Sequence, residues 1–124
     1  MCGACGSAGG TRDADAREVE DSPAARKRAQ LALVSWGSRL FAPDHIRVRE
    51  APGTVRVLVV GPTGQGVLAQ GADGVLDAVD RVGARTPDWT VVADRLRASR
   101  PGGDPDWAYR SLASAVARRR EPAQ

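Results

Sequence analysis

Three short β-type segments, separated by two turns rich in glycine and proline, occupy the middle of the chain. The first, 46–50, alternates apolar and charged residues, the second, 55–60, is almost continuously apolar, and the third covers 66–70. Turns of this length and composition connect neighbouring antiparallel strands. The pattern therefore predicts a three-stranded antiparallel β-meander. The apolar run of the second segment also predicts a central strand that is covered on both faces.

A helix is predicted directly before these strands. Ser22 is a good N-cap, and Pro23 suits the first helical position because its missing N–H would have no partner there. Apolar residues then recur every three or four positions, which predicts a helix over 23–41.

Three more helices are predicted after the strands. Asp73 is the expected cap of the first, and Gly83 its expected end. The tripeptide Pro-Asp-Trp occurs at 87–89 and again at 105–107. Each copy predicts a helix start, with a capping residue before the proline and an acid in the first turn. The sequence thus predicts an α+β fold, with an N-terminal helix packed on a three-stranded antiparallel meander, followed by three helices.

Composition divides the chain into three parts. Residues 1–10 are mostly small, and 11–21 hold five acids and two arginines, with Val19 as the one large aliphatic side chain after Met1; this composition predicts a flexible tail over 1–21. Residues 22–84 are expected to form a small α+β domain, and 85–120 a C-terminal helical pair. No run of 18 apolar residues and no basic-then-apolar leader is present, so we expect a cytoplasmic protein without a membrane partner.

The cysteines Cys2 and Cys5 form a C-x-x-C pair, the sharpest chemical motif in the sequence. This spacing lets two sulfurs bind one metal ion or form a disulfide. Structural zinc needs four ligands, which two copies of the chain would supply together. The hypotheses are therefore a zinc-capable pair, a thiol–disulfide redox pair, or two inert thiols with no cofactor.

Arginine carries most of the positive charge, with 17 arginines and one lysine in a chain of net charge +3. One hypothesis is that this reflects a GC-rich genome, and another is that it reflects contacts with phosphate. The possible polyanion contacts in the C-terminal helices are Arg95, Arg97, Arg118, Arg119 and Arg120. Arg47, Arg49 and Arg56 would form a further basic strip if their strands expose the same face of a hairpin.

The loop Gly61–Gly66 follows the most apolar segment and is rich in glycine. A phosphate-binding P-loop requires lysine at the position that Val67 occupies, so the loop is interpreted as a hairpin turn. The opening MCGACG, the helix and the later V-x-G-P-T-G hairpin together resemble a group of short actinobacterial proteins. The resemblance implies a bacterial origin and a possible role for the thiols, and no established activity comes with it.

No set of residues typical of a catalytic site is visible, so we expect a non-enzyme. The sequence favours an interaction or accessory module with a metal-capable cysteine pair, which binds a protein partner or a second copy of itself. The alternatives are a thiol–disulfide redox protein that uses Cys2 and Cys5, and a small nucleic-acid-binding protein that uses the C-terminal arginines.

Overall fold

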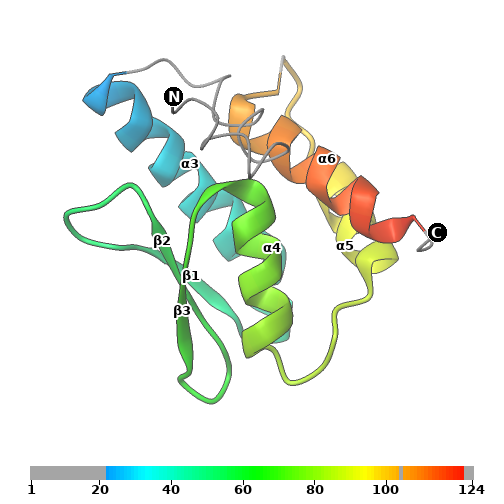
Figure 1. The fold of residues 1–124 in the computed structure, drawn as a ribbon. Coiled ribbons are helices and arrows are strands. Elements are labelled where there is room, and N and C mark those ends of the chain that lie inside the picture. Colours follow the sequence, from blue (N-terminus) through cyan, green and yellow to red (C-terminus); the bar gives the residue numbers. More distant parts are fainter. Residues whose placement is uncertain (1–21, 104, 122–124) are drawn as a thin grey trace, which may run out of the picture.

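The computed structural model describes residues 22–103 and 105–121. Its elements, in chain order, are α3 (Pro23–Phe41), the 3₁₀ turn η2 (Ala42–Asp44), β1 (Arg47–Glu50), β2 (Val57–Val60), β3 (Gly66–Ala69), α4 (Gly71–Val82), α5 (Trp89–Ala98) and α6 (Trp107–Arg120). A helix, three strands and three helices thus follow one another, as Figure 1 shows. The predicted α+β arrangement is confirmed.

Helix α3 begins and ends where the sequence predicts. The Ser22 hydroxyl accepts a hydrogen bond from the Ala25 N–H at 3.1 Å, and Pro23 is the first helical residue. The buried side of the helix carries Leu33, Trp36 and Leu40. A capped start and one apolar stripe therefore fix this helix against the rest of the molecule.

The three strands form an antiparallel sheet in the order β1-β2-β3. Val48 pairs with Val59 and Val59 with Val67, so the central strand is β2. In the β2–β3 turn, the Gly64 N–H donates to the Gly61 carbonyl at 3.0 Å. The meander and the hairpin turn that the sequence predicts are both present.

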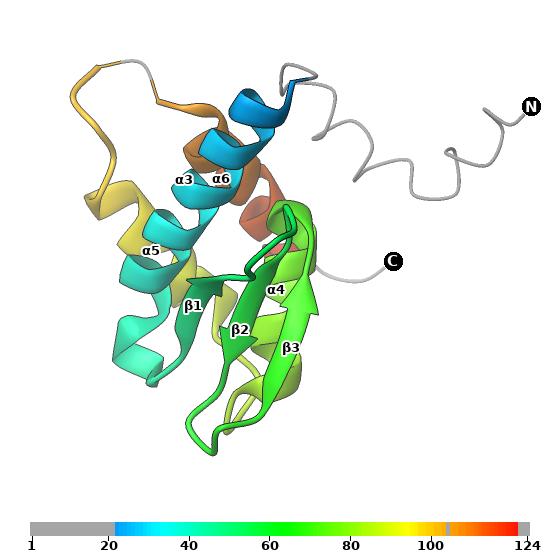
Figure 2. The ribbon, with the colours of Figure 1, turned by 90° about the vertical axis from the view of Figure 1, so that its left-hand side faces the viewer.

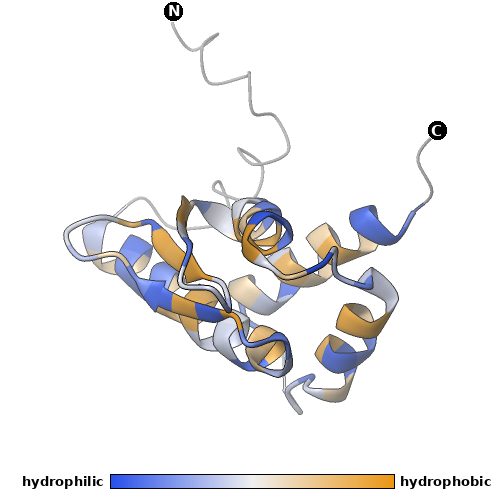
Figure 3. Ribbon diagram, turned by 90° about the horizontal axis from the view of Figure 1, so that it is seen from below, coloured by the Kyte–Doolittle hydropathy of each residue, from blue (hydrophilic) through white to orange (hydrophobic). Residues whose placement is uncertain are grey.

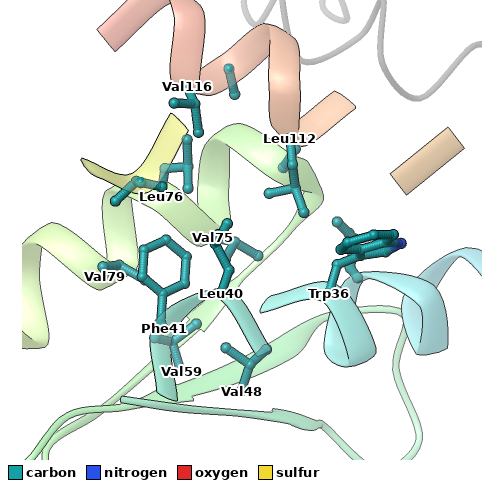
Figure 4. Packing of buried hydrophobic residues seen from close by; sticks show 14 of the residues in the cluster. Trp36, Leu40, Phe41, Val48, Val59, Val75, Leu76, Val79, Leu112 and Val116 are labelled. Atoms are coloured by element: carbon teal, nitrogen blue, oxygen red, sulfur yellow. The ribbon is translucent and has the colours of Figure 1, made fainter. Parts of the chain in front are cut away.

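One face of the sheet, called here the inner face, packs on the helices. Its buried residues are Val48, Val57, Val59 and Ala69, each at most 5% exposed. Figure 4 shows side chains from α3, the sheet, α4 and α6 converging on one cluster. Residues of α5 and α6 belong to the same cluster, so the C-terminal pair shares its core with the α+β part. That residues 22–84 form a domain by themselves stays a prediction.

The opposite face of the sheet, called here the outer face, carries no helix of the described chain. Val48 of β1 contacts the position of Gly37 in α3, and Ala69 of β3 contacts Gly74 in α4, so both helices lie on the inner face. Figure 2 shows the three strands side by side toward the viewer, with α4 behind them. The prediction that β2 is covered on both faces is therefore wrong. Its outward side chains, Leu58 and Val60, are half-buried by their neighbours in the sheet.

The helix starts after the sheet differ from the sequence predictions. Asp88 caps α5 by accepting from the Thr90 N–H at 3.0 Å, and Asp106 caps α6 by accepting from the Tyr109 N–H at 2.8 Å. The acid after each proline is thus the cap, and the expectation of a cap before the proline is wrong. The aspartate side chain can reach the N–H groups two and three positions ahead, which a residue before the proline is too distant to do.

Helix α4 also starts earlier than predicted. It begins at Gly71 with Gln70 in the N-cap position, and Asp73 lies in its first turn. There the Asp73 carboxylate accepts a hydrogen bond from Arg118 of α6 at 2.7 Å. Gly83 closes the helix as predicted, with its N–H on the Val79 carbonyl. In the part of the chain that the structure describes, no helix has the length and apolar character needed to cross a membrane.

Candidate interaction surface

The outer face of the sheet combines two arginines with three aliphatic side chains. The pairing register places Arg49 opposite Leu58 and Arg47 opposite Val60, and it places Leu58 opposite Leu68. Opposite residues of an antiparallel pair lie on the same face, so these five side chains form one surface. Leu68 is 51% exposed, although it is a large apolar residue.

Hydropathy alternates from one residue to the next along β1, whereas β2 is apolar throughout. Figure 3 shows both hydrophilic and hydrophobic stretches within the sheet. On β1, buried Val48 lies between exposed Arg47 and Arg49, and this confirms the facing predicted from the alternation. Side chains two residues apart on a strand are about 6.6–6.8 Å apart along it. The two guanidinium groups therefore stand side by side at one margin of the outer face.

Arg47 and Arg49 have no carboxylate partner within residues 22–103 and 105–121. The nearest acid in sequence, Glu50, pairs instead with Lys27 of α3. Arg56, the third member of the predicted strip, precedes β2 and is exposed. Arg47 and Arg49 are thus brought together on one face with their charges uncompensated by described residues, and the inclusion of Arg56 in the strip stays a prediction.

A shallow groove of about 590 Å³ adjoins these arginines. Its lining includes both of them, with Ser38 of α3, His45 and Pro62. His45 has φ +60°, and its N–H donates to the Ala42 carbonyl at 2.9 Å to close the 3₁₀ turn. The groove is therefore cationic on its strand side and lies between the end of α3 and the first strand.

The C-terminal arginines lie in a different electrostatic setting. Arg95 donates to Asp44 at 3.0 Å and to the Leu40 carbonyl at 3.2 Å. Arg118 donates to Asp73 at 2.7 Å, as noted above for α4. Two more of the predicted polyanion contacts form ion pairs: Arg97 with Asp94 and Arg119 with Asp77. A carboxylate partner competes with an incoming phosphate for the same guanidinium. Of the five predicted contacts, only the exposed Arg120 forms no ion pair with a described residue.

Close packing explains the glycine at position 61, at the start of the β2–β3 turn. A Cβ atom at Gly61 would lie 2.2 Å from the Val82 carbonyl oxygen at the end of α4. A glycine is therefore needed here because the turn passes directly against a helix end. This contact supports the interpretation of the loop as a turn.

The metal-capable pair Cys2 and Cys5 lies outside the described residues. Within those residues, no group of three or more histidine, cysteine, aspartate or glutamate side chains is arranged to hold a metal ion. The three tryptophans contribute to packing: Trp36 is buried, and Trp89 and Trp107 are half-buried against the core.

The sequence analysis did not predict the outer-face aliphatic group, which consists of half-buried Leu58 and Val60 and exposed Leu68. The available signal was the composition of the third strand, which has no charged residue on either face. Comparison with known proteins adds no further guide: the chain matches no family model, no curated protein and no solved structure.

Proposed function

We propose that this protein is a non-enzymatic binding module that holds an acidic segment of a protein partner across its outer face. The observation that carries the proposal is the pair Arg47 and Arg49, uncompensated by described carboxylates and placed beside an apolar strip. An arginine that is not already paired is available for bidentate contacts with carboxylates. The neighbouring Leu58 and Val60 offer apolar area to the same partner.

The spacing of the arginines defines the partner more closely. Their separation of about 6.6–6.8 Å along the strand equals the separation of alternate side chains on an extended peptide. A segment with acids at alternating positions, and apolar residues near them, fits this surface. The module would work in the cytoplasm, as the sequence predicts.

The test uses a fluorescein-labelled peptide of alternating glutamate and leucine, with binding followed by fluorescence anisotropy. The double variant Arg47→Glu/Arg49→Glu should weaken binding about tenfold or more, because it replaces attraction by repulsion at the centre of the contact. The matched control, Arg97→Glu/Arg120→Glu, lowers the net charge equally and should bind like the unmodified protein. Equal weakening by both variants would contradict a localised site.

The same variants examine the nucleic-acid alternative. If the protein binds a labelled DNA duplex in a salt-dependent way, the two double variants show which arginines are used. Loss of this binding in Arg97→Glu/Arg120→Glu but not in Arg47→Glu/Arg49→Glu would favour the nucleic-acid alternative over our proposal. The ion pairs of Arg95, Arg118 and Arg119 support the protein-binding function instead.

The proposal includes the cysteine pair as a zinc ligand set shared between two copies, on the strength of the C-x-x-C spacing alone. Metal analysis of untagged protein should give one zinc for every two chains, and Cys2→Ser should remove it. Disulfide turnover without bound zinc would favour the redox alternative.

A further inference from the structure

β3 is an edge strand with outward backbone groups that no described element covers. It pairs with β2 alone. The Gly61 N–H donates to the Gln65 carbonyl at 2.9 Å at the turn, which makes these residues a hydrogen-bonded pair. Such pairs alternate along an antiparallel ladder, so the N–H and C=O groups of Gly66 and Leu68 point away from β2. Both residues are exposed.

The other edge of the sheet is partly occupied by α3 and the turn after it. The Ser38 hydroxyl donates to the Val48 carbonyl at 2.9 Å, and the Ile46 N–H donates to the Phe41 carbonyl at 3.3 Å. Both groups belong to the outward side of β1, and both are thereby occupied. Two outward backbone groups at the β1 edge thus have partners in the described chain, whereas those of Gly66 and Leu68 at the β3 edge have none there.

The open edge also lacks the features that normally prevent strands from pairing. Residues 65–70 read Gln-Gly-Val-Leu-Ala-Gln, without a charge or a proline. Natural proteins usually protect an exposed edge with lysine, proline, a bulge or a covering segment. Leu68, at 51% exposed, adds an apolar side chain directly on this edge. The edge is therefore suited to pairing with another strand.

We infer that β3 pairs with β3 of a second copy of this chain, antiparallel, to form a continuous six-stranded sheet. A two-fold axis at Leu68 places its N–H and C=O opposite those of Leu68 of the partner subunit. The two leucine side chains then contact each other on the joined outer face. The same axis places Gly66 opposite Gln70 of the partner subunit, and glycine leaves room for the longer side chain there. One surface patch thereby complements itself, as an isologous dimer requires.

Charge favours a second copy over the acidic partner at this edge. An acidic strand would find no cation on residues 65–70 themselves, since Arg47 and Arg49 lie on β1 and Arg56 precedes β2. Neighbouring strands are about 4.7–4.9 Å apart, so β1 is roughly 10 Å from β3. Two neutral edges therefore approach each other without bringing their basic strips together. Strands of four residues bury less than a standard interface of about 1,200–2,000 Å², so the dimer should be reversible.

This dimer does not depend on the proposed acidic partner, because it uses the opposite edge of the sheet. It would, however, place two basic strips at the two ends of one sheet. A partner with two acidic segments could then bind both at once, with a gain in avidity.

The experiment measures the mass of the full chain by sedimentation velocity over roughly a hundredfold concentration range. Reductant and a chelator are present, so that neither a disulfide nor shared zinc contributes. The unmodified protein should move from the mass of one chain toward twice that mass. Leu68→Lys places two like charges opposite each other at the two-fold axis, and it should raise the dissociation constant of the dimer about tenfold or more. Thr63→Lys adds the same charge in the turn and should leave dimerisation unchanged.

Amide hydrogen exchange of the unmodified protein gives a second readout that needs no variant. The N–H groups of Gly66 and Leu68 should become protected as concentration rises, whereas those of Val67 and Ala69 should be protected at every concentration. A chain that stays monomeric throughout would overturn the inference. Equal dimerisation of Leu68→Lys and Thr63→Lys, or exchange at Leu68 that ignores concentration, would overturn it as well.

Discussion

The two faces of the sheet are built from the same three strands, yet they differ in what covers them. On the inner face, Val57 and Val59 are at most 1% exposed and pack against helices. On the outer face, the residues next to them in sequence, Leu58 and Val60, are half-buried and face no helix of the described chain. Neighbouring positions of similar hydrophobicity therefore contribute to the core on one side, whereas on the other side they belong to the surface for which we propose recognition. The comparison shows that a side chain's role here depends on what covers it rather than on its own polarity.

The largest effect is expected at Gly61, where the sheet meets the end of α4. Gly61→Ala would place a Cβ atom 2.2 Å from the Val82 carbonyl oxygen, so the turn or the helix end must move. We expect a loss of about 3 kcal/mol in the free energy of unfolding, or failure to fold. Urea denaturation measures the change. Gly102→Ala, where a Cβ atom meets nothing within 4 Å, is the control and should change stability little.

The comparison of the two faces is tested most directly by two adjacent truncations. Val59→Ala on the inner face leaves a cavity in a fully buried cluster and should cost about 2–3 kcal/mol. Val60→Ala on the outer face removes the same atoms from a half-buried position and should cost less than about 1 kcal/mol. Equal losses in urea denaturation would mean that something covers the outer face in solution.

A smaller effect is expected at Gln30, a polar residue buried on the helix side. Its side-chain amide donates to the carbonyls of Thr54 and Arg56, and so ties α3 to the connection between β1 and β2. Gln30→Leu leaves both carbonyls without this donor and should cost about 1–3 kcal/mol. Gln65→Leu, at an exposed turn position, should cost little in the same thermal or urea melts, and a similar loss there would contradict the role given to the buried amide.

The smallest effect on stability is expected for the outer-face arginines. Because Arg47 and Arg49 pair with no described carboxylate, Arg47→Glu/Arg49→Glu should change the free energy of unfolding by less than about 0.5 kcal/mol. The loss of peptide binding by this variant would then be a loss of contacts. A large destabilisation would instead assign the two side chains to the fold.

The sequence predicts the local features of this fold well, because their causes are local. The bounds of α3 follow from Ser22, Pro23 and the spacing of its apolar residues, and the facing of Arg47 and Arg49 follows from alternation along β1. These features need no knowledge of distant residues.

The features that the sequence does not predict depend on distant contacts. An apolar run such as β2 indicates a central strand, but whether both faces are covered depends on where α3 and α4 pack. Whether the C-terminal arginines are neutralised by carboxylates depends on residues such as Asp44 and Asp73, which lie 51 and 45 residues from the arginines that they pair with. The candidate site was thus half visible in the sequence: its arginines were singled out, whereas its open face and open edge were not.

The contact between Trp36 and Asp106 has a consequence for the order of folding. The indole N–H of Trp36 donates to the Asp106 carboxylate at 3.4 Å across 70 residues of sequence, and Tyr109 packs edge-on against the same ring at 5.1 Å. The strand pairs, by contrast, join elements that follow one another along the chain. Contacts between neighbours form before contacts that close a long loop, because loop closure costs more entropy. Helix α6 should therefore dock last, and with Trp89 and Trp107 replaced by phenylalanine the Trp36 indole would report that final step by its fluorescence.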